Sequence, residues 1–128
     1  MFSVGFTTYE GTVTAASEWG GAAETKQVRP ALYGSYEAIF HATGLGDFVL
    51  PLDAGSPAAG PLGHERLQRA IGVIYLPQRE RMSHYFHAQL SSQFDMVVHL
   101  DKTRAVEPLD RSAPAPSDEA PDTYPSAL

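Results

Sequence analysis

Glutamate and histidine recur at helical spacing in one short stretch of this sequence, at Glu80, His84 and His87. Residues three and four positions apart share one face of an α-helix, so these side chains could jointly bind a divalent metal or share a proton. Alternatively, they are the solvated face of an amphipathic helix whose apolar stripe runs from Met82 to Leu90. We favour the solvated face, because such a metal site needs a further ligand from elsewhere. The three residues are weak metal candidates, and no cofactor is predicted.

A second polar group follows the first apolar segment of the chain and consists of Thr8, Tyr9, Glu10 and Thr12. If residues 2–8 form a central strand, these side chains lie at its carboxyl end, where open α/β sheets bind their ligands. Glu10 could then accept a hydrogen bond from a substrate or orient a base. The competing interpretation is a plain turn, since Tyr, Glu and Gly in succession are typical of one. Two interpretations of these four residues therefore remain open, the lining of a substrate cleft and a turn.

Two further histidines, His41 and His99, stand beside apolar residues in a predicted helix and a predicted strand. An imidazole in such a position is usually a packing group whose ring nitrogens are hydrogen-bonded. We predict that role for both residues rather than a role in catalysis.

No familiar catalytic or ligand-binding motif is complete. No serine stands in a Gly-x-Ser-x-Gly sequence, and the glycines of 44–46 lack the third glycine of a dinucleotide fingerprint. His64 and Glu65 begin like a zinc-protease helix, but Gln68 stands where the second histidine belongs. With no cysteine in the chain, thiolate catalysis, disulfides and iron–sulfur or zinc–thiolate sites are excluded.

The charge balance bears on partners and location. Among 128 residues, 9 Lys and Arg face 15 Asp and Glu, for a net charge of -6, and the basic residues are scattered. Neither nucleic acid nor an anionic membrane surface is an expected partner. No apolar run approaches the roughly 18 residues of a membrane span. The first residues carry neither a basic nor a long apolar region of a secretory signal, so a cytoplasmic location is expected.

The elements that must position these residues alternate between the periods of a strand and of a helix. Strands are predicted over residues 2–8, 11–17, 47–52, 70–76 and 94–100. A short helix is predicted between Ser35 and Gly44, with the serine as N-cap, and a second helix begins at Pro77. Residues 19–34 and 53–64 are rich in Gly, Pro and polar side chains and are predicted loops. The alternation indicates an α/β fold with flanking helices.

The last residues of the chain differ in composition from the rest. Residues 110–128 combine Pro with acidic residues and little apolar surface, so a disordered acidic tail is predicted there. The predicted helices are too few and too short to cover the predicted sheet, and an uncovered sheet face or edge pairs with something else. We therefore expect residues 1–109 to be an incomplete domain.

Several segments, in order, resemble the carboxyl-terminal part of the erythromycin esterase-like family. The resemblance covers nearly all of residues 2–109. It rests on the sequence of residues 5–17 (GFTTYEGTVTAAS) with Trp19, Arg29-Pro30, 34–37 (GSYE), 72–75 (GVIY) with Pro77, 80–86 (ERMSHYF), 93–95 (QFD) and 101–109 (DKTRAVEPL).

The resemblance implies an α/β fold with a mostly parallel sheet and, for the full-length family, hydrolysis of carboxylic esters, with macrolide lactones opened by attack of water. It also implies that the histidines and glutamates that activate the water lie outside this chain, so that no catalytic residue carries over. A fragment or truncated homologue, inactive alone, is the favoured function. The alternative is a non-catalytic binding or assembly module that uses an exposed sheet edge. Expected partners are accordingly the missing amino-terminal part of the same fold or a second copy of this chain.

Overall fold

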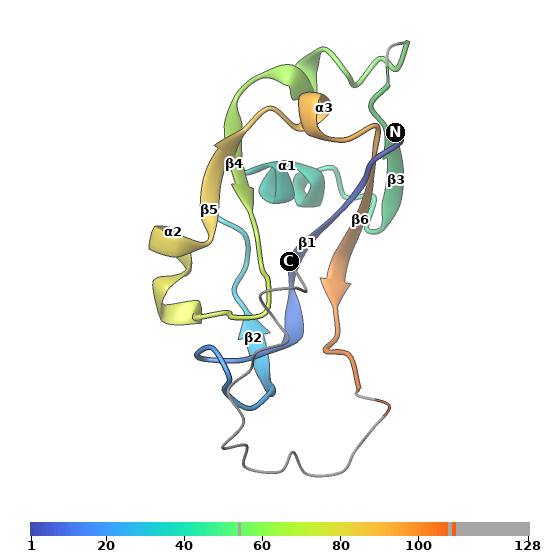
Figure 1. Ribbon diagram of the computed structural model, residues 1–128. Helices are drawn as coiled ribbons and strands as arrows, with labels where there is room; N and C mark the ends of the chain where they lie inside the picture. Colours follow the sequence, from blue (N-terminus) through green and yellow to red (C-terminus); the bar gives the residue numbers. More distant parts are fainter. Residues whose placement is uncertain (54, 108, 110–128) are drawn as a thin grey trace.

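A four-stranded sheet, a two-stranded sheet and several short helices make up this computed structural model, which describes residues 1–53, 55–107 and 109 (Figure 1). The elements, in chain order, are β1 (Val4–Ala15), β2 (Glu24–Val28), α1 (Tyr36–Ala42), β3 (Phe48–Pro51), η1 (Pro61–Gly63), β4 (Arg66–Arg69), η2 (Pro77–Arg79), α2 (Glu80–Ser83), β5 (Tyr85–Ala88), α3 (Leu90–Gln93) and β6 (Met96–Thr103).

The larger sheet is mixed, with strand order β2-β1-β6-β3. Only β1 and β6 run parallel, in a ladder from Val4 beside Met96 to Gly11 beside Thr103, while β2 and β3 are antiparallel to their neighbours. The α/β class is thus confirmed, and the prediction of a mostly parallel sheet is wrong. It failed because β3 lies next to β6 as an antiparallel strand, an arrangement that the apolar run of 47–52 cannot reveal.

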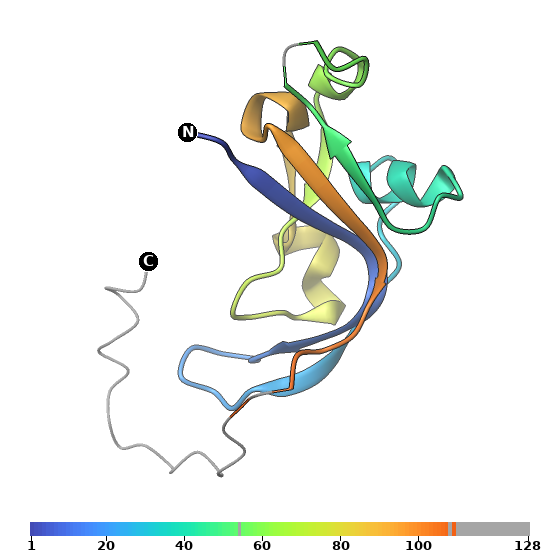
Figure 2. The ribbon, with the colours of Figure 1, turned by 90° about the vertical axis from the view of Figure 1, so that its right-hand side faces the viewer.

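The predicted strands 2–8 and 11–17 are one long strand, β1, which bends back on itself in its middle (Figure 2). Gly11 lies in this bend with φ of 136°, a conformation that favours glycine. A Cβ atom there would lie 2.0 Å from the carbonyl oxygen of Thr103 on the neighbouring strand. The close approach of the β1 and β6 backbones at the bend therefore depends on glycine.

Helix α1 forms where its sequence signals predict it. The Ser35 side chain accepts a hydrogen bond from the Ala38 amide at 3.2 Å and caps the first turn, and Gly44 follows the last turn with φ of 73°. The helix lies between β4 and the β1–β6 pair (Figure 1).

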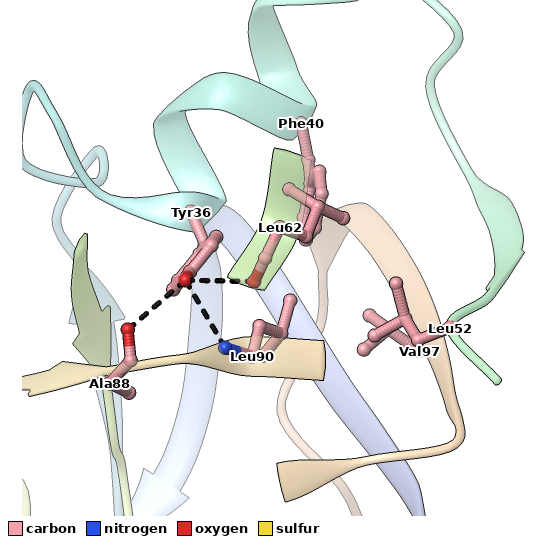
Figure 3. Close-up of a cluster of buried hydrophobic side chains, with 7 residues drawn as sticks. All are labelled: Tyr36, Phe40, Leu52, Leu62, Ala88, Leu90 and Val97. Carbon is pink, nitrogen blue, oxygen red and sulfur yellow. Dashed lines mark hydrogen bonds between the residues drawn. The ribbon is translucent and has the colours of Figure 1, made fainter. Parts of the chain in front are cut away.

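The main apolar core gathers around α1 (Figure 3) and consists of Tyr36, Phe40, Leu52, Leu62, Ala88, Leu90 and Val97. The Tyr36 hydroxyl is fully buried, lies 3.0 Å from the Ala88 carbonyl oxygen and accepts a hydrogen bond from the Leu90 amide at 3.1 Å. Leu62 comes from the segment 53–64, so this predicted loop contributes to the core through η1. The tyrosine satisfies backbone groups of α3 and β5 that would otherwise be buried without a partner.

Three predictions about secondary structure are wrong. The predicted loop 19–34 contains β2, an edge strand whose sequence ETKQV carries no apolar period because most of it faces solvent. The predicted strand 70–76 is irregular apart from an isolated bridge between Ile74 and Ala16, and the strand of this region is β4. The predicted helix from Pro77 ends at Ser83, because residues 85–88 pair with β4 as β5 instead.

One face of the larger sheet is open. Directly paired residues share a face, and this one carries Val4, Phe6, Val49, Met96, Val98 and Leu100, here named the open face. Phe6 is 71 % exposed and Val49 57 % exposed, whereas Val97 and His99 on the opposite face are fully buried under α1 and its neighbours. The expectation of an uncovered sheet is therefore confirmed within the residues described.

Among the described residues, no helix is long and apolar enough to span a membrane. The predicted acidic tail, 110–128, lies outside the described residues.

Candidate functional site

A pocket of about 220 Å³ lies beside the bend of β1. Its lining comes from both sides of the bend and from the segments that cross it, namely Phe6, Thr7, Thr8, Val13, Val28, Glu37, Arg69, Ile71, Leu100 and Thr103. Apolar side chains alternate there with a carboxyl group, a guanidinium group and hydroxyl groups. Apolar walls combined with polar groups that converge on one cavity are typical of ligand sites.

Glu37 supplies the carboxyl group of this pocket. It stands in the first turn of α1 and is 1 % exposed. Both carboxylate oxygens accept from the backbone amide of Arg69, at 3.3 and 3.2 Å. No guanidinium nitrogen of Arg69 is hydrogen-bonded to Glu37 in the part of the chain that the structure describes, so this buried carboxyl group lacks a directly bonded cation.

The Arg69 guanidinium is engaged elsewhere. One terminal nitrogen donates to the Glu80 carboxylate at 2.9 Å and to the Arg29 carbonyl at 2.6 Å. The other donates to the carbonyls of Thr8 and Tyr9, both at 2.8 Å. Arg69 thereby joins β4 to β1, to α2 and to the loop after β2, through a fork that only arginine offers.

Burial raises the pKa of Glu37 to about 7, against an ordinary value of 4.5. Hydrogen bonds from backbone amides and the charge of Arg69 oppose this shift without cancelling it. Burial likewise raises the pKa of Tyr75, whose hydroxyl donates to Glu80 at 2.6 Å, and that of Tyr85. A carboxyl group that titrates near neutrality in a pocket is suited to proton transfer or to donating a hydrogen bond.

We predict that this carboxyl group makes stability depend on pH. Between pH 4.5 and about 7 the folded chain holds a proton that the unfolded chain releases, so raising the pH across this range lowers the free energy of unfolding. The expected loss is about 3 kcal/mol, measured by urea denaturation at a series of pH values. Glu37→Gln should remove this slope, and a slope that persists in that variant contradicts the assignment.

A second polar cluster runs from the pocket to the surface. The Thr7 hydroxyl is 2.8 Å from His99 Nδ1, His99 Nε2 is 3.0 Å from Asp101, and Asp101 is 3.0 Å from His41 Nδ1. Burial opposes ionisation of Asp101, but hydrogen bonds from both histidines outweigh it and hold the pKa of Asp101 below its usual value. The fully buried His99 is satisfied at both ring nitrogens, as predicted for a packing histidine, whereas His41 is partly exposed.

The structure disperses the predicted cleft residues. Thr8 lines the pocket, whereas Thr12 lies in a separate groove with Glu24 and Arg104. The Tyr9 ring stacks on His41 at 3.6 Å, and the Glu10 carbonyl accepts from the Thr8 hydroxyl at 3.2 Å. Lining of a substrate cleft by these four residues stays a prediction.

The weak metal candidates do not share a helix face. Glu80 is buried against Arg69 and Tyr75, His84 ends α2 with its ring bonded to backbone groups, and His87 is exposed on β5. The interpretation of Glu80 as part of a solvated helix face is also wrong, because its side chain is buried. Both the metal site and the solvated face assumed one helix through His87, whereas α2 ends at Ser83. No group of three or more metal-binding side chains occurs in the described ranges.

The roles of Glu37, Arg69 and Asp101 cannot be seen in the sequence pattern. An acid in the first turn of a helix looks like an ordinary favourable charge, and nothing local shows that this one is buried. Arg69 directly precedes the predicted strand 70–76. Its partners come from several distant segments, so no spacing rule could identify it.

The comparisons with known proteins give one family and a partial match to larger solved structures. A model of the erythromycin esterase family matches residues 1–103. The crystal structure of a succinoglycan biosynthesis protein matches with a TM-score of 0.65 and 26 % identity over 80 % of this chain and 24 % of that chain. A structure from Bacillus cereus matches with a TM-score of 0.65 and 20 % identity, covering 80 % of this chain and 25 % of that one. The chain thus spans about a quarter of the length of these solved structures.

Proposed function

The chain belongs to the erythromycin esterase family, and on this premise we propose that it forms the carboxyl-terminal part of a larger carboxylic ester hydrolase fold and is inactive by itself. Its contribution is the β1–β6 pair, the pocket at the bend and the open face. The esters expected as substrates of the complete fold include macrolide lactones.

The open face is the observation that carries this proposal. In α/β proteins both faces of a sheet are normally covered by helices, and exposed apolar side chains that are contiguous mark a surface that another segment covers. Here α1 and α3 cover one face, while Phe6 and Val49 remain largely exposed on the other. The occupant that fits is the remainder of a fold four times as long, judged from the solved structures that share this part.

We predict that the purified chain hydrolyses neither macrolides nor simple aryl esters. Ester hydrolysis by water requires a positioned base, and the bases that the family resemblance implies lie outside these residues. The measurement is release of acid from an ester panel at pH 6 to 8. Turnover that persists in repurified protein and is abolished by Glu37→Gln would contradict the proposal, because it would show that the pocket is active alone.

The open face also favours the second candidate in an altered form, a non-catalytic assembly module that joins two copies through the sheet face rather than through the exposed sheet edge expected from the sequence. We predict that the wild-type chain self-associates in concentration-dependent fashion and that Val4→Lys, which places a charge on the open face, restores a monomer without lowering the melting temperature. Size-exclusion chromatography with light scattering makes the measurement. Met82→Lys is the matched control, since Met82 is 83 % exposed and lies on α2.

The form of association separates the two candidates. A dimer of fixed stoichiometry that Val4→Lys abolishes supports the assembly module. Association without fixed stoichiometry, equally sensitive to Val4→Lys, supports the first candidate, in which the rest of a larger fold covers the open face. A compact wild-type monomer that is unaffected by Val4→Lys contradicts both.

A further inference from the structure

We infer that the pocket at the bend of β1 is a binding site for a small neutral carbonyl compound, with Glu37 as its hydrogen-bond donor. This inference goes beyond the proposed function, because it requires neither hydrolysis nor the rest of the fold.

The size and walls of the pocket set the class of ligand. A cavity of about 150 Å³ accepts benzene, so 220 Å³ accommodates one ring with a small substituent and excludes a macrolide. Val13, Val28, Ile71 and Leu100 line it with apolar surface that favours an aromatic or aliphatic body. The ligand is therefore small and mostly apolar.

The polar groups of the pocket set the functional group of the ligand. The Thr7 hydroxyl is bonded to His99, the Thr8 hydroxyl to Glu10 and Thr103, and the Arg69 guanidinium to four acceptors. The Glu37 carboxyl group accepts hydrogen bonds from the backbone amides of Arg69 and of its own residue and is nearly fully buried. When protonated, Glu37 also carries a proton that none of its hydrogen bonds among the described residues uses, because in all of them it is the acceptor.

The protonation state of Glu37 selects a carbonyl acceptor. With a pKa raised by burial to about 7, the carboxyl group is largely protonated in mildly acidic solution and can donate a hydrogen bond. An anionic ligand would find the one cation of the described lining, Arg69, already paired with Glu80, and a protonated amine would have to leave water for an apolar wall. A neutral ketone, aldehyde or ester avoids both costs.

Several other charged or titratable groups surround Glu37, and the test must exclude them. Arg69 on β4, Glu80 on α2 and Tyr85 on β5 interact with its charge. His99, Asp101 and His41 lie beyond Thr7. Glu37→Gln leaves all of these groups in place and keeps a hydrogen-bond donor at every pH, so it isolates the proton of Glu37.

The experiment titrates the full chain with acetophenone at pH 5.5 and pH 8.5 and follows methyl resonances by NMR. We expect saturable shifts at Val28 and Ile71, with affinity about tenfold weaker at pH 8.5 because the donor proton is lost. In Glu37→Gln the two affinities should agree. Ethylbenzene, which has the same ring and no carbonyl oxygen, should bind without dependence on pH.

Three results would overturn the inference: no saturable shift, shifts confined to Val4 and Val49 on the open face, or the same pH dependence in Glu37→Gln or with ethylbenzene. Thermal melting of Glu37→Gln at both pH values establishes that the variant is folded. If the ketone fails to bind while Val4→Lys still abolishes association, this inference fails and the proposed function stands. Conversely, if the ketone binds as expected but the isolated chain hydrolyses esters, the proposed function fails and this inference stands.

Discussion

Arg69→Leu is expected to lower the free energy of unfolding by about 3–5 kcal/mol, as removal of one partner from a buried ion pair does. The substitution leaves the Glu80 carboxylate without its cation and removes one hydrogen-bond donor from each of the carbonyls of Thr8, Tyr9 and Arg29. Both groups of the ion pair are 2 % exposed, so water cannot replace the lost contacts. Urea denaturation at pH 6 measures the loss.

Arg66→Leu is the matched control for this prediction. Arg66 lies on the same strand, but its Nε is buried without a hydrogen-bond partner in the described part of the chain. We expect a change below about 1 kcal/mol, because no comparable set of acceptors loses its donor. The double substitution Arg69→Leu with Glu80→Gln should recover part of the loss by removing the unpaired charge. Equal losses for Arg69→Leu and Arg66→Leu would show that the guanidinium does not hold the segments together.

Gly11→Ala is expected to destabilise the fold by more than about 3 kcal/mol, for two reasons that add. The backbone conformation at φ of 136° is strained for any residue with a side chain, at a cost of about 1–3 kcal/mol. The added Cβ would also overlap the Thr103 carbonyl oxygen and so separate β1 from β6 at the bend. Chemical denaturation gives the total, and amide hydrogen exchange at residues 101–103 shows whether the ladder opens there.

Gly34→Ala separates these two contributions. Gly34 also has a positive φ, 89°, but a Cβ there would meet nothing within 4 Å. Its expected cost is therefore the backbone strain alone, about 1 kcal/mol. If both alanine variants lose the same stability, the close approach at Thr103 has no energetic importance.

The elements that the sequence predicted well are those whose signals are local. The Ser35 cap and the following helical period define α1, the apolar run at 47–52 contains β3, and the run at 94–100 contains the first part of β6. The resemblance of residues 2–109 to the erythromycin esterase-like family likewise rests on contiguous residues and agrees with the match over 1–103. Local signals of this kind need no knowledge of the tertiary structure.

The features that the sequence concealed depend on partners far along the chain. β2 is a polar edge strand that exists because β1 pairs with it, and β5 replaces a helix because β4 supplies backbone partners for residues 85–88. Burial turns the ordinary Glu37 of a first helical turn into a pocket acid, and the elements that pack against its helix are β1, β4 and β6. Such features follow from topology, which the periodicity of one segment does not contain.

The parallel pairing of β1 with β6 has a kinetic consequence. Thr7 and His99 are direct neighbours in this ladder although 92 residues separate them in the chain. Closure of so long a loop precedes any gain from the ladder, and folds dominated by such distant contacts fold slowly. During synthesis on the ribosome, β1 emerges long before β6, and although residues 11–15 can pair with β2 early, the amino-terminal part of β1 must wait for its strand partner. This interval, rather than the finished fold, is when the first strand is most open to misassembly and to chaperones.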